Sequence, residues 1–472
     1  MTGHTKYFHF KHHLFMIGFG CVGRGVLPLI LRHLHIKPEQ ITILTAEEGG
    51  MAEAKEYGVE FLIQPLTPDN YRHILASRMN RGDFVVNASV NVSSRDLVML
   101  CQEKGANYID TCIEPWAGGY TDPQLSVSDR SNYGLREQIL QLRSQYPKGP
   151  TAVLAHGANP GLVSHFLKQA LLNMAKDTQV SIAPPQQKQD WAKLAQTLNI
   201  CAIHVSERDT QVAHTAKEPG EFVNTWSIDG FFGEGLQPAE LGWGTHEKEL
   251  PGDGRRHSFG CDAAIYLSRP GYMTRVRSWT PLEGAYQGFL ITHNEAISIA
   301  DFLTVTEGAK PHYRPTCHYA YHPCDDAVLS VHELGGKNGQ LQTRKRLMMD
   351  EIIKGADELG VLLMGHPKGV YWYGSRLSIE EARKLAPYNN ATSLQVTSSV
   401  LAGMIWILEN PNRGLVEPED LDFTRALEIA RPYLGEVIGV WGDWTPLQGR
   451  SVLFEEDVDR SDPWQFKNIR VH

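Results

Sequence analysis

The chain has 472 residues, of which 42% are hydrophobic, and this length predicts two or three globular domains that each bury a core. Its 45 basic and 54 acidic side chains give a formal charge of −9 without a basic cluster, which argues against nucleic acid as a partner. The seven cysteines form no C-x-x-C pair, so we expect no disulfide scaffold and a reducing, cytoplasmic setting.

A strand, a tight turn and a helix are predicted near the N-terminus. LFMIGF (14–19) is a short apolar run, and VGRGVLPLILRHL (22–34) has apolar residues at helical spacing, although Pro28 should disturb that helix. The apolar run is too short and too rich in glycine for an export signal or a membrane span. We therefore expect neither export nor a membrane partner.

Further short strands follow through residue 157, with helix-like segments between most of them. They are ITILT (41–45), VEFLIQP (59–65), DFVVNAS (83–89), NYIDT (107–111) and TAVLAHG (151–157). Such alternation predicts an α/β fold with a Rossmann-type, doubly wound parallel sheet. We assign residues 1–157 to this first domain.

The pattern changes after GANPGL (157–162), where loops become longer and aromatic residues more frequent. We assign residues 158–390 to a second, α+β domain. The remainder, 391–472, reads as a helical segment that packs back on the first domain.

A glycine-rich motif lies between the first predicted strand and helix. Gly18, Gly20, Cys21, Val22 and Gly23 belong to a G-x-G-x-x-G pattern in the context that a dinucleotide site requires. The first glycine permits the turn, the second lets a pyrophosphate approach, and the third allows close packing of helix and strand, while the helix N-terminus favours negative charge. The motif predicts a dinucleotide cofactor.

The end of the second strand bears on which dinucleotide binds. ITILT ends at Thr45 rather than at the usual acid, and the nearest acids are Glu47 and Glu48. Because no arginine adjoins them in the sequence, we predict NAD rather than NADP, with Glu47 near the ribose.

Other residues at strand ends should line the same crevice, because ligands of open parallel sheets bind at the carboxyl ends of the strands. The predicted cofactor contacts are Asn87, Ala88, Ser89, Asp110 and Thr111. For Asn87 and Ser89, ordinary capping of the next helix remains the alternative.

Acids and aromatic residues recur in four stretches. NTWSIDGFFGEG (224–235) places Trp226 near Glu234, and an aromatic face beside carboxylates suits an organic cation. The alternative is a turn with a buried tryptophan and solvated acids. EPWAGGY contains Glu114, HVSERD contains Glu207, and ITHNEA contains His293 and Glu295; taken singly, each also fits an ordinary structural role.

Taken together and in this order, these stretches resemble the bacterial homospermidine synthases. The resemblance covers essentially the whole chain, through MIGFGCVGRG, NASVNVSS, YIDTCIEPWAGGY, LAHGANPGLVSHF, NTWSIDGFFGEGLQPAELGWGTHE, RPTCHYAYHPCDDAVLS and KGVYWYGSRLS. It implies a Rossmann domain joined to a domain for substrate binding and dimerisation, a homodimer, and tightly held NAD. It also implies condensation of two putrescine molecules, or of spermidine and putrescine, into homospermidine with loss of ammonia or diaminopropane.

The resemblance also implies the site residues. The catalytic residues would be Glu207, Trp226, Glu234 and His293, and the substrate-binding residues would be Glu114, Asn159 and Glu295. Trp226 would hold the cation at the reacting end, while Glu207 and Glu234 would neutralise ammonium groups. Hydride can leave only from a neutral amine, so some group must accept a proton, and His293 and Glu207 are the candidates.

Two other functions remain open from the sequence. A reductase resembling saccharopine or carboxynorspermidine dehydrogenase would bind carboxylates through arginine, and Arg208 beside Glu207 is the residue to watch. A dinucleotide sensor without catalysis is the second alternative. The segment CHYAYHPC (317–324) fits no zinc-finger spacing, and we predict no metal.

Overall fold

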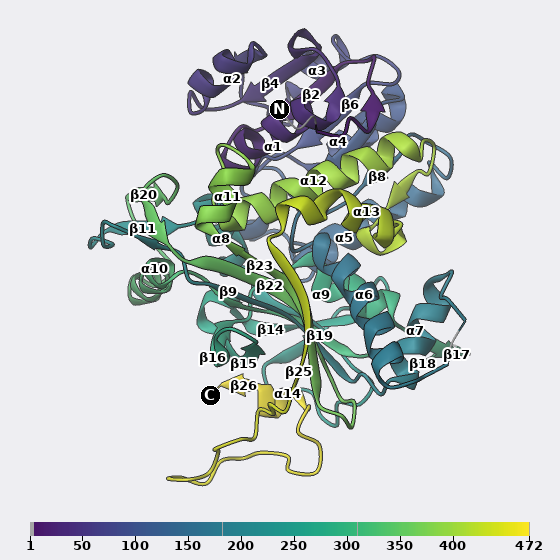
Figure 1. The fold of residues 1–472 in the computed structure, drawn as a ribbon, viewed down its shortest axis with the longest axis vertical. Coiled ribbons are helices and arrows are strands. Elements are labelled where there is room, and N and C mark those ends of the chain that lie inside the picture. The colour runs from purple at the N-terminus through teal and green to yellow at the C-terminus, as the bar shows by residue number, and fades with distance from the viewer. Residues whose placement is uncertain (1–3, 182, 309, 472) are drawn as a thin grey trace. The chain divides into compact units, whose positions relative to one another are not determined.

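The computed structural model describes residues 4–181, 183–308 and 310–471 (Figure 1). The chain forms two compact units. The first contains the residues up to Leu162 together with Ile379–Gly435, and the second contains Val163–Ser378 together with the residues from Glu436 onward. Each unit is built around its own large sheet.

The sheet of the first unit is parallel throughout. Its order is β24-β8-β7-β6-β2-β4-β5. In chain order the strands are β2 (Leu14–Ile17), β4 (Ile41–Thr45), β5 (Glu60–Ile63), β6 (Phe84–Asn87), β7 (Asn107–Asp110), β8 (Ala152–Val153) and β24 (Leu415–Val416). The order reverses at β2, which lies between β4 and β6, and this switch point is where open parallel sheets bind ligands.

Helices and a short parallel strand pair, β1 (Phe8–His9) with β3 (Leu34–His35), complete the first unit. The helices are α1 (Cys21–His33), α2 (Met51–Tyr57), α3 (Tyr71–Ala76), α4 (Ser94–Lys104), α5 (Asn132–Leu140), α11 (Ile379–Leu385), α12 (Ala391–Glu409) and α13 (Phe423–Ala430). The expected disturbance at Pro28 is wrong, because α1 continues through it to His33. Burial of this stretch of α1 compensates for the hydrogen bond that proline cannot donate.

Helix α12 is apolar because it lies in the core. By length and composition it could cross a membrane, but 94% of its most apolar window is buried inside the protein. It packs against α1 and α13. An apolar surface of this kind is what a central helix needs when neighbours cover it on all sides.

The second unit contains a mixed sheet with the path β13-β14-β12-β19-β9-β22-β23-β25, to which β15, β16 and β26 are attached. The strands are β9 (Ala202–Asp209), β12 (Pro238–Gly242), β13 (Gly254–Arg256), β14 (Ala264–Pro270), β15 (Arg275–Thr280), β16 (Gly284–Phe289), β19 (Thr316–His322), β22 (Ala356–Met364), β23 (Val370–Ser378), β25 (Glu436–Gly442) and β26 (Arg470–Val471). Strands β9 and β19 are parallel neighbours at its centre, with Glu207 opposite Tyr321.

Small strand pairs and helices surround this sheet. The pairs are β10 (Val212–Ala213) with β21 (Ile352–Lys354), β11 (Glu221–Asn224) with β20 (Arg344–Leu347), and β17 (Val305–Glu307) with β18 (Lys310–Tyr313). The helices are α6 (Leu162–Asp177), α7 (Lys188–Thr197), α8 (Ile228–Leu236), α9 (Asn294–Phe302), α10 (Asp325–Gly336) and α14 (Phe466–Ile469). Helix α9 packs on β12 and β19, two neighbouring strands of the sheet.

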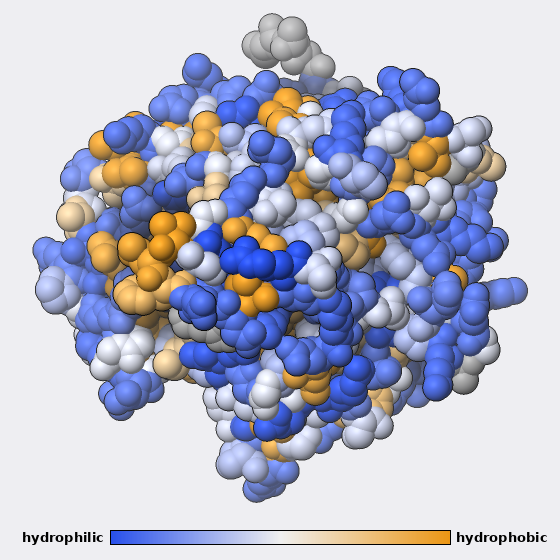
Figure 2. Space-filling model, turned by 90° about the horizontal axis from the view of Figure 1, so that it is seen from below, coloured by the Kyte–Doolittle hydropathy of each residue, from blue (hydrophilic) through white to orange (hydrophobic). Residues whose placement is uncertain are grey.

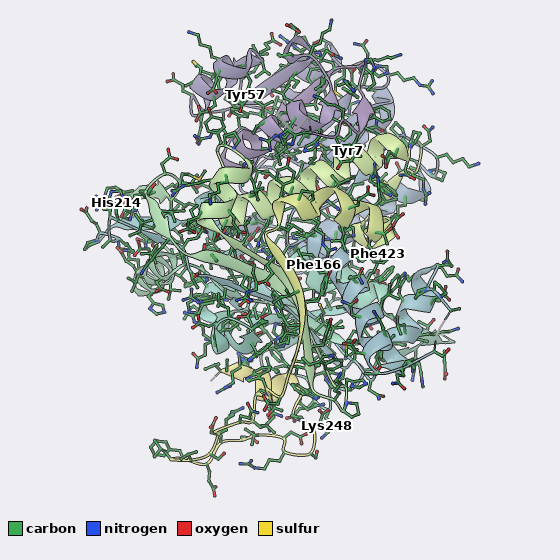
Figure 3. The ribbon with its side chains drawn as sticks, in the orientation of Figure 1. Tyr7, Tyr57, Phe166, His214, Lys248 and Phe423 are labelled. Carbon is green, nitrogen blue, oxygen red and sulfur yellow. The ribbon has the colours of Figure 1, made fainter. Side chains whose placement is uncertain are left out.

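Side chains are sorted by polarity as expected for a globular chain. In Figure 3, Phe166 of α6 lies inside the second unit, where its ring contacts that of Tyr373 at 5.6 Å between centroids. Figure 2 shows a face on which hydrophilic side chains predominate and apolar ones form small groups. The fold is therefore stabilised mainly by burial of the apolar faces of both sheets.

The predicted α/β fold class is confirmed, but the predicted segment 391–472 is not one piece. Residues up to Gly435 belong to the first unit, whereas β25 pairs with β23 in the second sheet. The boundaries of the units also differ from those predicted, with the first crossing at Leu162 and the return at Ile379. Strand β25 was missed because EVIGVWG, with its two glycines, has no clear alternation of polar and apolar residues.

A buried ion pair joins the two parts of the first unit. Arg136 of α5 donates from Nε and Nη2 to the two carboxylate oxygens of Glu417, at 2.6 and 2.9 Å, and its side chain is only 1% exposed. We predict that Arg136→Met lowers the free energy of unfolding by about 3 kcal/mol, because it leaves a buried carboxylate without this partner. Thermal and denaturant unfolding would measure the loss. The double variant Arg136→Met/Glu417→Met should recover most of it, and a fully stable single variant would contradict this account.

Candidate active site

The glycine-rich loop follows β2 and leads into α1, as the motif predicts. Gly18 has φ +83°, a conformation that favours glycine, and its N–H donates to the Leu44 carbonyl at 2.8 Å. A Cβ on Gly18 would come within 2.8 Å of the Ala88 carbonyl oxygen and of Ser89 Cα. The structure therefore brings the loop and the residues after β6 together at the switch point of the sheet.

The other two glycines of the motif have different roles, one in helix packing and one in leaving space for a ligand. A Cβ on Gly23 would lie 2.8 Å from the Gly18 carbonyl oxygen, so this glycine allows α1 to pack closely. A Cβ on Gly20 would meet no atom within 4 Å. Gly20 is exposed and precedes the first turn of α1, so the loop leaves open space where a pyrophosphate would meet the helix N-terminus. These residues fit a dinucleotide.

The polar residues at the neighbouring strand ends form a buried network. Asn87 donates to the Tyr108 hydroxyl at 3.2 Å, and Tyr108 donates to Asp110 Oδ2 at 2.8 Å. Asp110 Oδ1 accepts from Ala155 N–H at 2.5 Å, and Asn87 Oδ1 accepts from the Ser89 hydroxyl at 2.5 Å. Burial raises the pKa of Asp110 to about 6, although these hydrogen bonds oppose the rise. Asn87 and Asp110 thus shape the crevice through protein contacts, and their contact with cofactor stays a prediction.

The reasoning that no arginine lies near the end of the second strand is wrong. Arg24 of α1 reaches the loop after β4, where its Cδ would lie 3.3 Å from a Cβ on Gly50. Its Nη1 is 3.2 Å from Glu53 Oε1, so a carboxylate already neutralises this charge. Glu47 is exposed, and Thr111 is half-buried beside Gly157. Sequence reasoning missed Arg24 because it considered only residues adjacent to Thr45.

In the second unit, His293 lies between two carboxylates. Its Nε2 is 3.0 Å from Glu234 Oε2 and its Nδ1 is 3.2 Å from Glu295 Oε1. His293 precedes α9 and Glu295 lies in the first turn of that helix, while Glu234 comes from α8. Burial alone would lower the pKa of His293, but the charges and hydrogen bonds of Glu295 and Glu234 outweigh it and raise the pKa to about 10. His293 is therefore an imidazolium at neutral pH.

Tyr319 joins this charged group to Glu207. The His293 and Tyr319 rings are 4.3 Å apart between centroids, with 33° between their planes. The Tyr319 hydroxyl donates to Glu207 Oε2 at 2.5 Å. Both Tyr319 and Glu207 are buried, and β19 and β9 position them as parallel neighbours.

Tyr321 connects the same group to Trp226. Its ring stacks on that of Tyr319 at 5.1 Å with 16° between planes, and its hydroxyl accepts from the Trp226 indole N–H at 2.9 Å. The Trp226 ring also contacts Phe231 at 5.5 Å. Trp226 and Glu234 are half-buried, whereas His293 and Glu207 are buried. The open side of this acid–aromatic cluster is therefore formed by Trp226 and Glu234.

Buried polar atoms beside His293 lack hydrogen-bond partners among the described residues. They are Oε2 of Glu295 and both side-chain polar atoms of Asn294. Such atoms are rare in folded proteins because each costs desolvation energy, and at a site they mark where a ligand or water completes the contacts. Sequence reasoning missed Asn294, and it missed Tyr319 and Tyr321 because it weighed CHYAYHPC as a metal motif.

The structure thus joins five of the seven predicted pocket residues within the second unit: Glu207, Trp226, Glu234, His293 and Glu295. Glu114 and Asn159 belong to the first unit. Glu114 follows β7 and accepts from Asn91 N–H at 3.0 Å, and Asn159 lies in the tight loop in which Gly157 N–H donates to the Pro160 carbonyl at 2.6 Å.

Arg208 does not belong to the cluster. It follows Glu207 on β9, so its side chain points to the other face of the sheet. There it pairs with Glu283 and Asp325, each at 3.1 Å. The carboxylate-binding arginine that a dehydrogenase-like substrate would need is therefore not supplied by this residue.

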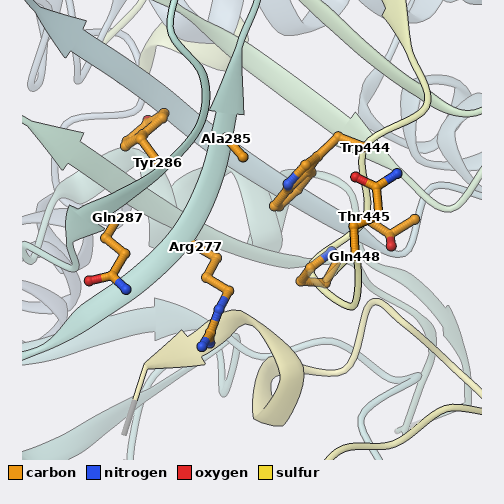
Figure 4. A pocket seen from close by; sticks show the side chains of 8 residues that line it. Arg277, Ala285, Tyr286, Gln287, Trp444, Thr445 and Gln448 are labelled. Carbon is orange, nitrogen blue, oxygen red and sulfur yellow. The ribbon is translucent and has the colours of Figure 1, made fainter. Parts of the chain in front are cut away.

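A surface pocket of the second unit lies away from the predicted residues (Figure 4). It is lined by Arg277, Ala285, Tyr286, Gln287, Trp444, Thr445, Pro446 and Gln448. Tyr286 hydrogen-bonds with Ser206, which alternates with Glu207 and so faces the other side of β9. Within the described ranges, no group of three or more His, Cys, Asp or Glu side chains could hold a metal ion.

Comparison with known proteins agrees with this arrangement. The saccharopine dehydrogenase NADP binding domain family matches residues 14–153, and the saccharopine dehydrogenase C-terminal domain family matches residues 157–443. The first match confirms the predicted dinucleotide-binding domain. The second covers most of the unit that contains the acid–aromatic cluster.

Full-length relatives are closely similar. The chain is 55% identical to a homospermidine synthase of Blastochloris viridis, covering 100% of both chains, and 51% identical to one of Mesorhizobium japonicum, covering 97% of this chain and 96% of the relative. The crystal structure of a homospermidine synthase from Legionella pneumophila in complex with NAD matches with a TM-score of 0.92 and 52% identity over 98% of each chain. The resemblance inferred from the sequence motifs is confirmed.

We predict that substitutions at two glycines of the loop affect different properties, NAD binding in one case and stability in the other. Gly20→Ala should fold normally, because its φ of −75° suits alanine and its Cβ meets open space, yet NAD should bind at least about tenfold more weakly. Gly23→Ala should instead lower the melting temperature, since overpacking costs about 1–3 kcal/mol. Calorimetric titration with NAD and thermal unfolding would measure both variants. Equal NAD affinity of Gly20→Ala and the wild type would show that the loop does not face the pyrophosphate.

The raised pKa of His293 predicts a pH-dependent contribution to stability. Because the pKa in the fold is about 10 and the ordinary value is 6.5, the contribution is complete below pH 6.5 and declines as pH rises toward 10. The stability difference between wild type and His293→Gln should therefore shrink with rising pH, by at most about 1.4 kcal/mol per unit. Thermal unfolding at pH 6.5, 8 and 9.5 would measure it. A difference that grows with pH would mean that His293 is neutral in the fold.

Proposed function

The chain belongs to the homospermidine synthases, within the saccharopine dehydrogenase family, and from this premise we propose that it condenses two putrescine molecules into homospermidine with release of ammonia. Spermidine with putrescine, releasing diaminopropane, is the alternative substrate pair. The observation that carries the proposal is the acid–aromatic cluster, in which contacts join Trp226 and Glu207 to the carboxylates of Glu234 and Glu295.

The charge of the cluster suits a diamine. With His293 protonated, the group Glu234–His293–Glu295 has two negative charges and one positive charge, a net charge of −1 while both carboxylates are ionised. Glu207 adds a further carboxylate through Tyr319. An aliphatic dication gains from such charge in a buried setting, where ionic attraction is screened less than in water.

Glu295 and Trp226 offer the substrate specific contacts within the cluster. Glu295 Oε2 is a buried acceptor without a hydrogen-bond partner among the described residues, and an ammonium group would satisfy it. Trp226 forms part of the open side, and its indole N–H is fixed by Tyr321. The ring is therefore held in one orientation, which favours contact between its face and a substrate cation.

Glu207 is the better of the two candidates for accepting the substrate proton. His293, the other candidate, is already protonated at neutral pH because two carboxylates flank it. A primary alkylammonium has a pKa near that of lysine, about 10.4, so a base must remove its proton before the amine-bearing carbon can be oxidised. We assign this step to the Glu207 carboxylate, which can return the proton to the departing ammonia.

The first unit would hold NAD through the glycine loop, with Gly20 at the pyrophosphate and the N-terminus of α1 facing its charge. When bound, NAD supplies reversible hydride acceptance, so the condensation needs no external oxidant or reductant. On the resemblance to the family, Glu114 and Asn159 of this unit are also proposed as substrate-binding residues. The neutralised Arg24 supports NAD over NADP, because Glu53 competes with an added phosphate for its guanidinium.

We further propose that the protein acts as a homodimer in the cytoplasm. The resemblance to the homospermidine synthases supports the dimer, and the free cysteines of the described chain are compatible with a reducing compartment. Light scattering coupled to size-exclusion chromatography would test the oligomeric state directly.

Incubation of the purified protein with putrescine and a small amount of NAD tests the proposed reaction. Homospermidine and ammonia in equal amounts, without lasting change in the absorbance of reduced cofactor, are expected. Steady consumption or formation of reduced cofactor would instead indicate a dehydrogenase. The absence of any turnover despite NAD binding would favour a dinucleotide sensor.

Substitution of Trp226 tests the role of the aromatic face. Trp226→Ala should lower turnover roughly thirtyfold, since a desolvated contact between a cation and an aromatic ring is worth about 2 kcal/mol. Trp226→Phe serves as the control, because it keeps a ring face but removes the indole N–H that Tyr321 accepts. Steady-state assays with putrescine would measure both, and unchanged activity of Trp226→Ala would remove the ring from the mechanism.

A further inference from the structure

Tyr319 contacts Glu207 through its hydroxyl group and His293 through its ring. Its hydroxyl donates to Glu207 Oε2 at 2.5 Å, while its ring lies between the rings of His293 and Tyr321, at 4.3 and 5.1 Å. The side chain is buried at 2% exposure. Tyr319 therefore contacts both His293, which lies between two carboxylates, and Glu207, the carboxylate to which we assign proton transfer.

The register of β19 with β9 creates this link. Tyr321 is directly opposite Glu207, and Tyr319 is opposite Val205, two residues earlier. The Tyr319 hydroxyl nevertheless reaches forward along β9 to Glu207, whereas the Tyr321 hydroxyl accepts the Trp226 N–H. Two tyrosines on one face of the same strand therefore have different partners, which makes them a natural pair for comparison.

A hydroxyl that donates to a carboxylate stabilises its ionised form and fixes its orientation. The imidazolium of His293, whose ring centroid lies 4.3 Å from that of Tyr319, adds positive charge beside the phenol. Such charge polarises the O–H group and strengthens its donation to Glu207. Glu207 would in this way be kept ready to accept a proton although it is buried.

Other titratable groups also face Glu207. Tyr321 of β19 and Tyr286 of β16 lie within reach of its charge. Asp209 lies two residues along β9, and on β22 the apolar Leu359 is opposite Glu207, with Asp357 opposite Asp209. Arg208 points to the other face and pairs there. On this face Tyr319 donates a hydrogen bond to Glu207, and this bond favours the charged form of the carboxylate.

We propose that Tyr319 is a positioning residue that holds Glu207 as an oriented, ionised carboxylate for accepting the proton of the substrate ammonium group. The inference rests on the proposed function, because it names the group that prepares the proton acceptor of that reaction. The ligand is that of the proposed reaction, a primary alkylammonium. The contact between Tyr319 and Glu207 is a hydrogen bond, and no covalent bond forms or breaks there.

The test uses the full-length, NAD-loaded enzyme and the pH dependence of kcat/KM for putrescine. In Tyr319→Phe the ring keeps its contacts but Glu207 loses the hydrogen bond from this hydroxyl, so the acidic limb of the profile should move up by about one pH unit, a tenfold change in the protonation equilibrium. Tyr321→Phe is the matched control. It removes the hydroxyl that accepts from Trp226 but keeps the bond between Tyr319 and Glu207, so its acidic limb should coincide with that of the wild type.

A second variant covers the case in which Tyr319→Phe does not fold. Replacement of Tyr319 by 3-fluorotyrosine keeps the size of the ring but makes the phenol a stronger donor, so the acidic limb should move down. A rate loss without movement of the limb in either variant would overturn the inference and leave Tyr319 a packing residue. A wild-type enzyme without activity on putrescine would instead overturn the proposed function itself, so the two failures are distinguishable.

Discussion

The parallel pairing of β9 with β19 is the constraint on which the candidate site depends. It places Glu207 opposite Tyr321 and brings the Tyr319 hydroxyl within hydrogen-bond distance of Glu207. Because side chains alternate across a strand, the same pairing turns Arg208 and His318 to the opposite face. A slip of one residue would exchange these two sets and turn the Glu207 carboxylate away from the cluster. The register of these two strands thus decides whether Glu207 joins the carboxylates that α8 and α9 supply.

The second physical feature is an imidazolium held between carboxylates. Burial would ordinarily make a histidine neutral, as it does for the neighbouring rings of His204 and His318, where burial lowers the pKa of His318 to about 4. At His293 the two carboxylates reverse this effect. Burial is the largest single influence on the pKa of both histidines, and at His293 the two flanking carboxylates together outweigh it. A fixed positive charge inside an acidic cluster limits mutual repulsion of the carboxylates while leaving the net charge negative.

The cofactor loop and the acid–aromatic cluster are built in different ways. The loop depends on residues without side chains, because a Cβ on Gly18 or Gly23 would collide with backbone atoms and one on Gly20 would fill open space. The cluster works by the presence of side chains whose polar atoms are paired with one another or, at Glu295 and Asn294, lack partners within the described residues. The first arrangement leaves room for a pyrophosphate at the helix N-terminus, and the second suits a small charged ligand.

The sequence by itself determined the features that depend on neighbouring residues. Apolar runs, helical spacing and the glycine motif predicted the parallel sheet of the first unit, its strands other than β24 within a few residues, and the dinucleotide loop, because each of these arises from neighbouring residues. Motif resemblance also identified five acids and aromatics that the second unit joins. The tertiary structure alone decided which of them touch. The contact of Glu234 with His293 spans 59 residues and that of Tyr319 with Glu207 spans 112. No local pattern encodes such distances, so the protonation of His293, the place of Arg24 and the role of Tyr319 followed only from the folded chain.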